Sequence, residues 1–157
     1  MFSKVLIVVT VLTAGLLYKN DKINVIKWQE LEKRIHAPND TTYIFNFWAT
    51  WCKPCVEELP DFERINEETQ GQKVKVVLVS MDMSEWADTK VPDFMVKKNI
   101  QSEVVLLDEV DGNIYINKVD SSWSGAIPAT LIVNNSNGYR YFHEGKLSYE
   151  ELKEHIK

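Results

Sequence analysis

Cys52 and Cys55 are the only two cysteines in this chain of 157 residues. An apolar run at 43–48 precedes them, and a pattern typical of a helix follows. Two thiols at this spacing can open and close a disulfide without a large backbone movement. A Cys-x-x-Cys pair between a strand and a helix is typical of thiol redox chemistry. The segment therefore predicts a reversible dithiol.

The two thiols are predicted to have different tasks. Attack on a disulfide requires a thiolate, and an isolated cysteine is mostly protonated at neutral pH. Cys52 is expected at the N-terminus of the helix, where free N–H groups and the helix dipole favour negative charge. Lys53 adds a positive charge beside it, and Pro54 fits the first helical turn because its missing N–H costs nothing there. Cys52 is thus the predicted attacking thiolate, and the more buried Cys55 is predicted to resolve the mixed disulfide.

Glu58 lies one helical turn beyond Cys55 and is expected to approach the buried thiol. A partly buried carboxylate at this position can accept and return the proton that Cys55 must lose. The alternative is that Glu58 only stabilises the first turns of the helix. Both interpretations stay open. Trp51, beside the attacking sulfur, is predicted to serve as a lid or a docking surface.

Hydrophobic periodicity places this motif within alternating strands and helices. The segments expected to be strands are 41–48, 73–81, 103–107, 129–133 and 139–143. The segments expected to be helices are 28–35, 54–70 with a kink at Pro60, 88–99 and 147–157 with Ser148 as N-cap. The stretch 108–124 is expected to be irregular. This order predicts an α/β fold with helices on both faces of a parallel sheet and a C-terminal antiparallel hairpin.

The composition favours one globular domain, predicted over residues 21–157. Hydrophobic residues make up 45% of the chain and charged residues 26%, which are ordinary globular values. The net charge of −5 argues against a nucleic-acid-binding surface. The three histidines are scattered along the chain without a spacing that pairs them with the cysteines. We therefore expect neither a metal site nor a cofactor.

Residues 1–20 differ in character from the rest of the chain. Lys4 is followed by an uncharged and mostly apolar run at 5–18. The run is shorter than the roughly 20 residues of a bilayer span, and Thr13-Ala14-Gly15 offers a cleavage site of small residues. We predict a signal peptide or an N-terminal membrane anchor, with a buried element of the domain as the alternative. Export would place the cysteine pair outside the cytosol, where disulfides persist.

Three segments resemble a known family. The segment 47–55 resembles the active-site segment of the thioredoxin superfamily, and 57–60 resembles its extracytoplasmic TlpA/ResA branch. The segment 125–130 resembles the second signature of the family, a cis-proline loop that leads into a strand. The long stretch 81–124 resembles the insertion of that branch. This resemblance, which runs from Lys22 to the C-terminus, implies a thioredoxin-like three-layer α/β/α sandwich with a central mixed sheet.

The resemblance also implies a substrate-binding edge. It implies that the Ile127–Pro128 bond is cis and faces the cysteine pair, which the X-Pro sequence permits. It implies as well that the backbone of Ile127 pairs with an extended substrate segment, as an added strand would. The predicted substrate-binding residues are therefore Trp51, Lys53, Pro54, Ile127 and Pro128.

One departure from the family pattern concerns proton handling. Many thioredoxins carry a buried aspartate where this chain has Asn46, and an amide cannot take up a proton. This departure shifts the expected proton handling toward Glu58.

Two alternative functions stay open. A peroxiredoxin-like thiol peroxidase would want a threonine three residues before its reactive cysteine, where Ala49 stands. The other alternative is a non-enzymatic binding domain with a structural disulfide. A disulfide that encloses only two residues at the mouth of a helix is poorly suited to stabilising a fold.

The sequence as a whole predicts an extracytoplasmic thiol–disulfide oxidoreductase, with Cys52, Cys55 and Glu58 as its catalytic residues. The expected partners are protein thiols or disulfides and an upstream electron donor, and the expected state is a monomer. The resemblance suggests a reductase, with cytochrome c maturation as a candidate pathway. The direction of electron flow depends on the reduction potential, which Lys53 and Pro54 do not determine.

Overall fold

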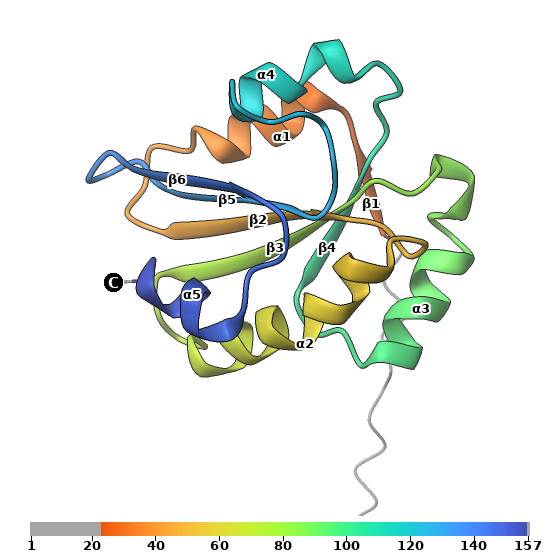
Figure 1. Cartoon of the computed structure of the whole chain (residues 1–157), viewed down its shortest axis with the longest axis horizontal. Helices are drawn as coiled ribbons and strands as arrows, with labels where there is room; N and C mark the ends of the chain where they lie inside the picture. Colours follow the sequence, from red (N-terminus) through yellow and green to blue (C-terminus); the bar gives the residue numbers. More distant parts are fainter. Residues whose placement is uncertain (1–22, 157) are drawn as a thin grey trace, which may run out of the picture.

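The computed structural model describes residues 23–156, and a six-stranded sheet lies at its centre (Figure 1). The strand order is β1-β4-β3-β2-β5-β6. The strands are β1 (Asn24–Ile26), β2 (Thr42–Trp48), β3 (Val74–Ser80), β4 (Glu103–Leu107), β5 (Ala129–Asn134) and β6 (Tyr139–Glu144). The first four strands run parallel, whereas β5 pairs antiparallel with both β2 and β6. The predicted mixed sheet with a C-terminal hairpin is confirmed.

Helices cover both faces of this sheet, as predicted (Figure 1). They are α1 (Trp28–Ile35), α2 (Lys53–Glu68), α3 (Lys90–Lys98), α4 (Ile116–Val119) and α5 (Tyr149–Glu154). Short 3-10 turns at Ser84–Trp86 and Gly112–Ile114 precede α3 and α4. Helices α1 and α4 lie over one face, and α2, α3 and α5 lie over the other. The result is a three-layer arrangement.

The alternation of side chains along β2 supplies both cores. Successive residues of a strand point to opposite faces of a sheet. Ile44 and Trp48 accordingly belong to the cluster that packs under α2, while Phe45 and Phe47 belong to the cluster on the side of α1 and α4. All four side chains are fully buried. Asn46 shares the parity of Ile44 and Trp48, so its amide is directed toward α2 within an otherwise apolar layer.

The structure differs from the sequence prediction at several element boundaries. Strand β1 pairs with β4 but has only three residues, too few for a periodic pattern to show. The C-terminal helix ends at Glu154 and begins after Ser148, which forms a full capping box with Glu151. Helix α2 continues through Pro60 as one helix. Within residues 23–156, no helix has the length and apolar character needed to cross a membrane. The predicted leader at 1–20 lies outside the described residues.

Candidate active site

The cysteine pair forms a closed disulfide at the mouth of α2. Cys52 is the N-cap of the helix, and the backbone N–H of Cys55 donates to its sulfur over 3.3 Å. Cys52 is 6% exposed and Cys55 is fully buried, which is the order of exposure expected from the sequence. The Cys52 sulfur therefore sits where the free N–H groups of a helix N-terminus stabilise negative charge.

The loop before β5 forms the opposite wall of the site. The Ile127–Pro128 peptide bond is cis, as the family resemblance implied. The carbonyl oxygen of Ile127 lies 3.7 Å from the Cys52 sulfur. Pro128 is buried, while Ile127 is half-buried. A backbone edge thus borders the more accessible sulfur directly.

The residues around Cys52 present an open, partly apolar surface. Trp51 is 63% exposed, and both Lys53 and Pro54 are exposed as well. A large exposed apolar side chain next to a reactive group, as Trp51 is next to Cys52 in the chain, is suited to contact with a protein partner. The roles of Trp51, Lys53 and Pro54 in substrate binding stay predictions.

Glu58 is buried beneath the first turns of α2, with 1% of its surface exposed. Its Oε1 accepts a hydrogen bond from Asn46 Nδ2 over 2.8 Å, and its Oε2 accepts one from the backbone N–H of Leu147 over 2.9 Å. Burial raises the pKa of Glu58 to about 7, although both hydrogen bonds favour the ionised form. The carboxyl group can therefore change its protonation state near neutral pH.

Asn46 connects Glu58 to β5. Its Nδ2 donates to Glu58 and also to Thr130 Oγ1 over 3.1 Å. Among residues 23–156, its Oδ1 finds no hydrogen-bond partner although it is buried. A protonated Glu58 becomes a donor, and a half-turn of the Asn46 amide would present Oδ1 as its acceptor. Asn46 thus suits both protonation states of the carboxyl, a role that the sequence comparison with aspartate did not suggest.

Asp82 is a site residue that the sequence interpretation missed. It is 3% exposed and lies two residues beyond β3. Its carboxylate accepts from the backbone N–H of Thr50 at 3.0 Å, from Thr50 Oγ1 at 2.7 Å and from Ser80 Oγ at 2.8 Å. Asp82 therefore clamps the turn that leads into Cys52. One sequence signal could have identified Asp82: it directly follows the predicted strand at 73–81, which contains β3. Because parallel strands end at the same edge of a sheet, a residue after β3 is expected near the residues after β2, which include Cys52.

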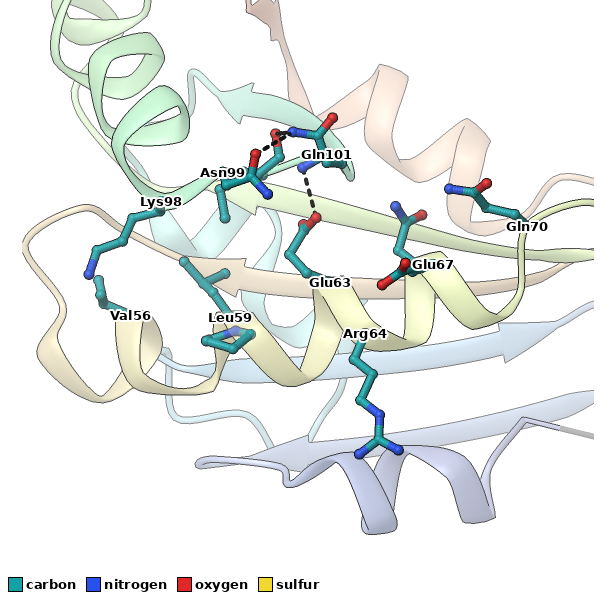
Figure 2. A pocket seen from close by; sticks show the side chains of 12 residues that line it. Val56, Leu59, Glu63, Arg64, Glu67, Gln70, Lys98, Asn99 and Gln101 are labelled. Carbon is teal, nitrogen blue, oxygen red and sulfur yellow. Dashed lines mark hydrogen bonds between the residues drawn. The ribbon is translucent and has the colours of Figure 1, made fainter.

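A groove of about 470 Å³ lies between α2 and the connection from α3 to β4 (Figure 2). Neither cysteine and no residue of the cis-proline loop lines it. Inside the groove, Glu63 accepts hydrogen bonds from the backbone N–H groups of Gln101 and Ser102, which ties α2 to the segment just before β4.

Over residues 23–156, histidine, cysteine and carboxylate side chains form no cluster of three that could hold a metal ion.

Comparison with known proteins places the fold and the cysteine motif in context. Residues 20–141 match the model of the AhpC/TSA family. The sporulation thiol-disulfide oxidoreductase A of Bacillus subtilis is 29% identical over 111 residues, which are 71% of this chain and 64% of that protein. The thiol-disulfide oxidoreductase ResA of Geobacillus thermodenitrificans is 24% identical over 135 residues, 81% of this chain and 70% of that protein. The chain thus spans less than two thirds of the first of these relatives.

Among solved structures, the crystal structure of StoA from Bacillus subtilis resembles this chain with a TM-score of 0.60. The two sequences are 27% identical, and the match covers 76% of this chain and 86% of that one. Together with the strand order and the two helical layers, this match confirms the predicted thioredoxin-like fold.

The clamp at Asp82 predicts a loss of stability on substitution. We expect Asp82→Ala to lower the free energy of unfolding by about 2 kcal/mol, because the Thr50 N–H and the Ser80 hydroxyl lose a buried acceptor. Asp82→Asn retains a carbonyl oxygen for the Thr50 N–H and should cost less. Denaturant unfolding of the oxidised protein measures both. Equal stability of Asp82→Ala and the parent would contradict the clamp.

Proposed function

Because this chain belongs to the AhpC/TSA family and holds its two cysteines opposite a cis-proline loop, we propose that it is a thiol–disulfide oxidoreductase. The observation that carries the proposal is the position of the Cys52 sulfur. It lies at the N-terminus of α2, accepts a hydrogen bond from the N–H of Cys55 and borders the Ile127 carbonyl. The relatives named as thiol-disulfide oxidoreductases support the same reaction class.

The proposed reaction begins with the reduced dithiol. The Cys52 thiolate attacks one sulfur of a substrate disulfide, and the other substrate sulfur leaves as a thiolate and takes up a proton. Cys55 then gives its proton to Glu58 and attacks the Cys52 sulfur of the mixed disulfide. The second substrate sulfur leaves as a thiolate, and the protein retains the Cys52–Cys55 disulfide. Two electrons pass to the substrate, so a thiol donor must reduce the protein for the next cycle.

The proposed substrate is a protein segment in extended conformation. The half-buried Ile127 backbone offers the edge on which such a segment can pair as an added strand. Trp51, the chain neighbour of Cys52, supplies an exposed apolar surface, and Lys53 and Pro54 are exposed as well. A disulfide carried on such a segment would be presented to Cys52 next to the Ile127 edge.

The proposed setting is outside the cytoplasm. The apolar leader at 1–20 supports export, with the thioredoxin-like domain at 21–157 either released or tethered to the membrane. The proposed role there is reduction of protein disulfides, which agrees with the relative named thiol-disulfide oxidoreductase ResA. Cytochrome c maturation, which the family resemblance suggests, is the candidate pathway, and a monomer is the proposed state.

The peroxidase alternative finds less support from the site. The position three residues before Cys52 is Ala49, and the hydroxyl of neighbouring Thr50 donates to Asp82 over 2.7 Å. The Thr50 hydroxyl proton is therefore engaged in this hydrogen bond and is not available to donate to a bound peroxide.

A trapping experiment tests the proposed reaction. In Cys55→Ser, the mixed disulfide on Cys52 cannot be resolved, so we expect protein partners to accumulate on Cys52 in the native host. Non-reducing electrophoresis followed by reduction identifies them. Cys52→Ser serves as the matched control and should trap far fewer partners. If both variants recover nothing, the disulfide is structural and the proposed function is wrong.

The reduction potential tests the proposed direction. Such folds range from about −270 mV for reducing proteins to about −120 mV for oxidising ones. We expect a value near the reducing end of this range. Equilibration of the purified domain with glutathione or dithiothreitol redox buffers gives the potential. A value at the oxidising end would overturn the assignment as a reductase while leaving the dithiol chemistry intact.

The raised pKa of Glu58 predicts a pH dependence of stability. An unfolded glutamate releases its proton near pH 4.5, whereas burial holds the proton in the folded protein until about pH 7. Stability should therefore fall as pH rises between these values, by about 3 kcal/mol in the oxidised protein. Glu58→Gln should remove this decline. Chemical denaturation at closely spaced pH values measures both proteins.

The neighbouring Glu57 provides a matched control for Glu58. Glu57 is exposed and accepts a hydrogen bond from Lys146, which lowers its pKa. Glu57→Gln should keep the decline of stability between pH 4.5 and 7.

Thiol alkylation in the reduced proteins tests the proton transfer itself. Glu58→Gln should lower the pH at which the thiols are alkylated, because the negative charge of the Glu58 carboxylate is removed. Unchanged thiol titration would remove the proposed role of Glu58 in proton transfer.

A further inference from the structure

The loop at 123–128 is held in place by Trp123, and we propose that Trp123 is a positioning residue that selects protein substrates over small disulfides. The proposal rests on the proposed oxidoreductase function and deepens it. It concerns the backbone edge at Ile127, whose carbonyl oxygen lies 3.7 Å from the Cys52 sulfur.

The indole of Trp123 is bonded to the loop that carries this edge. Its Nε1 donates to the carbonyl oxygen of Ala126 over 2.8 Å. Ala126 directly precedes Ile127 in the chain, so the bond fixes the peptide unit next to the docking edge. Trp123 is only 4% exposed, and a buried donor of this kind is costly to leave without its acceptor.

The indole ring itself is wedged among aromatic side chains from three parts of the fold. Its centroid lies 4.8 Å from that of Phe47 on β2, 5.9 Å from that of Tyr115 before α4 and 6.1 Å from that of Phe142 on β6. Aromatic rings packed in this way have little freedom to move. The Trp123 N–H is therefore a fixed donor, anchored in the core cluster on the side of α1 and α4.

A second contact holds the same loop from β6. The carboxylate of Glu144 accepts from the backbone N–H of Ser124 at 2.7 Å and from its hydroxyl at 2.8 Å. Gly125 has φ +91°, and the Ile116 side chain of α4 lies 2.8 Å from the place that a Cβ would occupy. A side chain at this position would be strained by the positive φ, and the end of the Ile116 side chain would have to shift to make room for it. The loop is thus bonded or packed against its surroundings on both sides before it reaches Ile127.

A preset edge matters only to a substrate that pairs with it. An extended protein segment that adds to the Ile127 backbone binds more tightly when the edge is already ordered, because less freedom is lost on binding. A small disulfide needs only the Cys52 sulfur. Loosening the loop should therefore weaken protein substrates selectively, through KM more than kcat.

The test is the variant Trp123→Phe, assayed with insulin as protein disulfide and cystamine as small disulfide, with dithiothreitol as reductant. Loss of the hydrogen bond to Ala126 should lower kcat/KM for insulin about fivefold, mainly by raising KM. The value for cystamine should stay within about twofold of the parent. Glu144→Ala, which removes both acceptors of Ser124 and leaves the aromatic cluster intact, should change the ratio in the same direction if Trp123→Phe does not fold.

Trp28→Phe is the matched control for lost packing. Trp28 is 1% exposed, and its ring centroid lies 6.2 Å from that of Tyr115, in the same cluster as Trp123. Its Nε1 has no hydrogen-bond partner in the part of the chain that the structure describes. This variant should keep the parental ratio of insulin to cystamine activity. The ratio, rather than either rate alone, isolates the bond to Ala126.

Two results would overturn the proposal while leaving the proposed function standing. One is an equal fall for insulin and cystamine in Trp123→Phe, and the other is the same change of ratio in Trp28→Phe. Either would make Trp123 a structural residue only. A parent protein that reduces neither disulfide would instead refute the oxidoreductase function, and this proposal with it.

Discussion

The pairing of β2 with β3 on one side and β5 on the other is the constraint on which the site depends. Trp48 at the end of β2 lies beside Ser80 at the end of β3, and Phe47 lies beside Ala129 at the start of β5. The turn before Cys52, the loop that contains Asp82 and the cis-proline loop therefore all emerge at one edge of the sheet. A register shift of one residue in either pairing would turn the β2 side chains to the wrong faces and separate these loops.

Under this edge, a buried carboxyl group opposes the tendency of the helix N-terminus to hold negative charge. The α2 N-terminus favours a thiolate on Cys52, whereas an ionised Glu58 one turn below Cys55 disfavours a second charge. Burial resolves the conflict because it brings the pKa of Glu58 to about 7. A group with this pKa can accept a proton and release it again at neutral pH, which is the requirement for a general base. Asn46 and Leu147 keep the carboxyl oriented in this layer.

Much of this arrangement could be predicted from local signals. The cysteine spacing, the apolar runs of β2 and β3, the turn before β6 and the Ser148 cap each depend on residues close in the sequence. The contacts that were missed join distant segments: Thr50 with Asp82, and β1 with β4. A lone aspartate after a strand and a three-residue strand have no periodic pattern. Their positions become meaningful only when the order of the strands is known.

The stretch 81–124, which separates β3 from the cis-proline loop, is more than a connection. Asp82 lies near its start and clamps the turn before Cys52, while Trp123 lies near its end and bonds the loop before Ile127. Both are buried, and each acts on a different wall of the same site. Asp82 bonds the turn before Cys52 and Ser80 at the end of β3, whereas the Trp123 indole bonds the cis-proline loop and packs against Phe47, Tyr115 and Phe142. A substitution at Asp82 or at Trp123 would therefore act first on one wall, while the cysteine motif and its helix keep their own sequence.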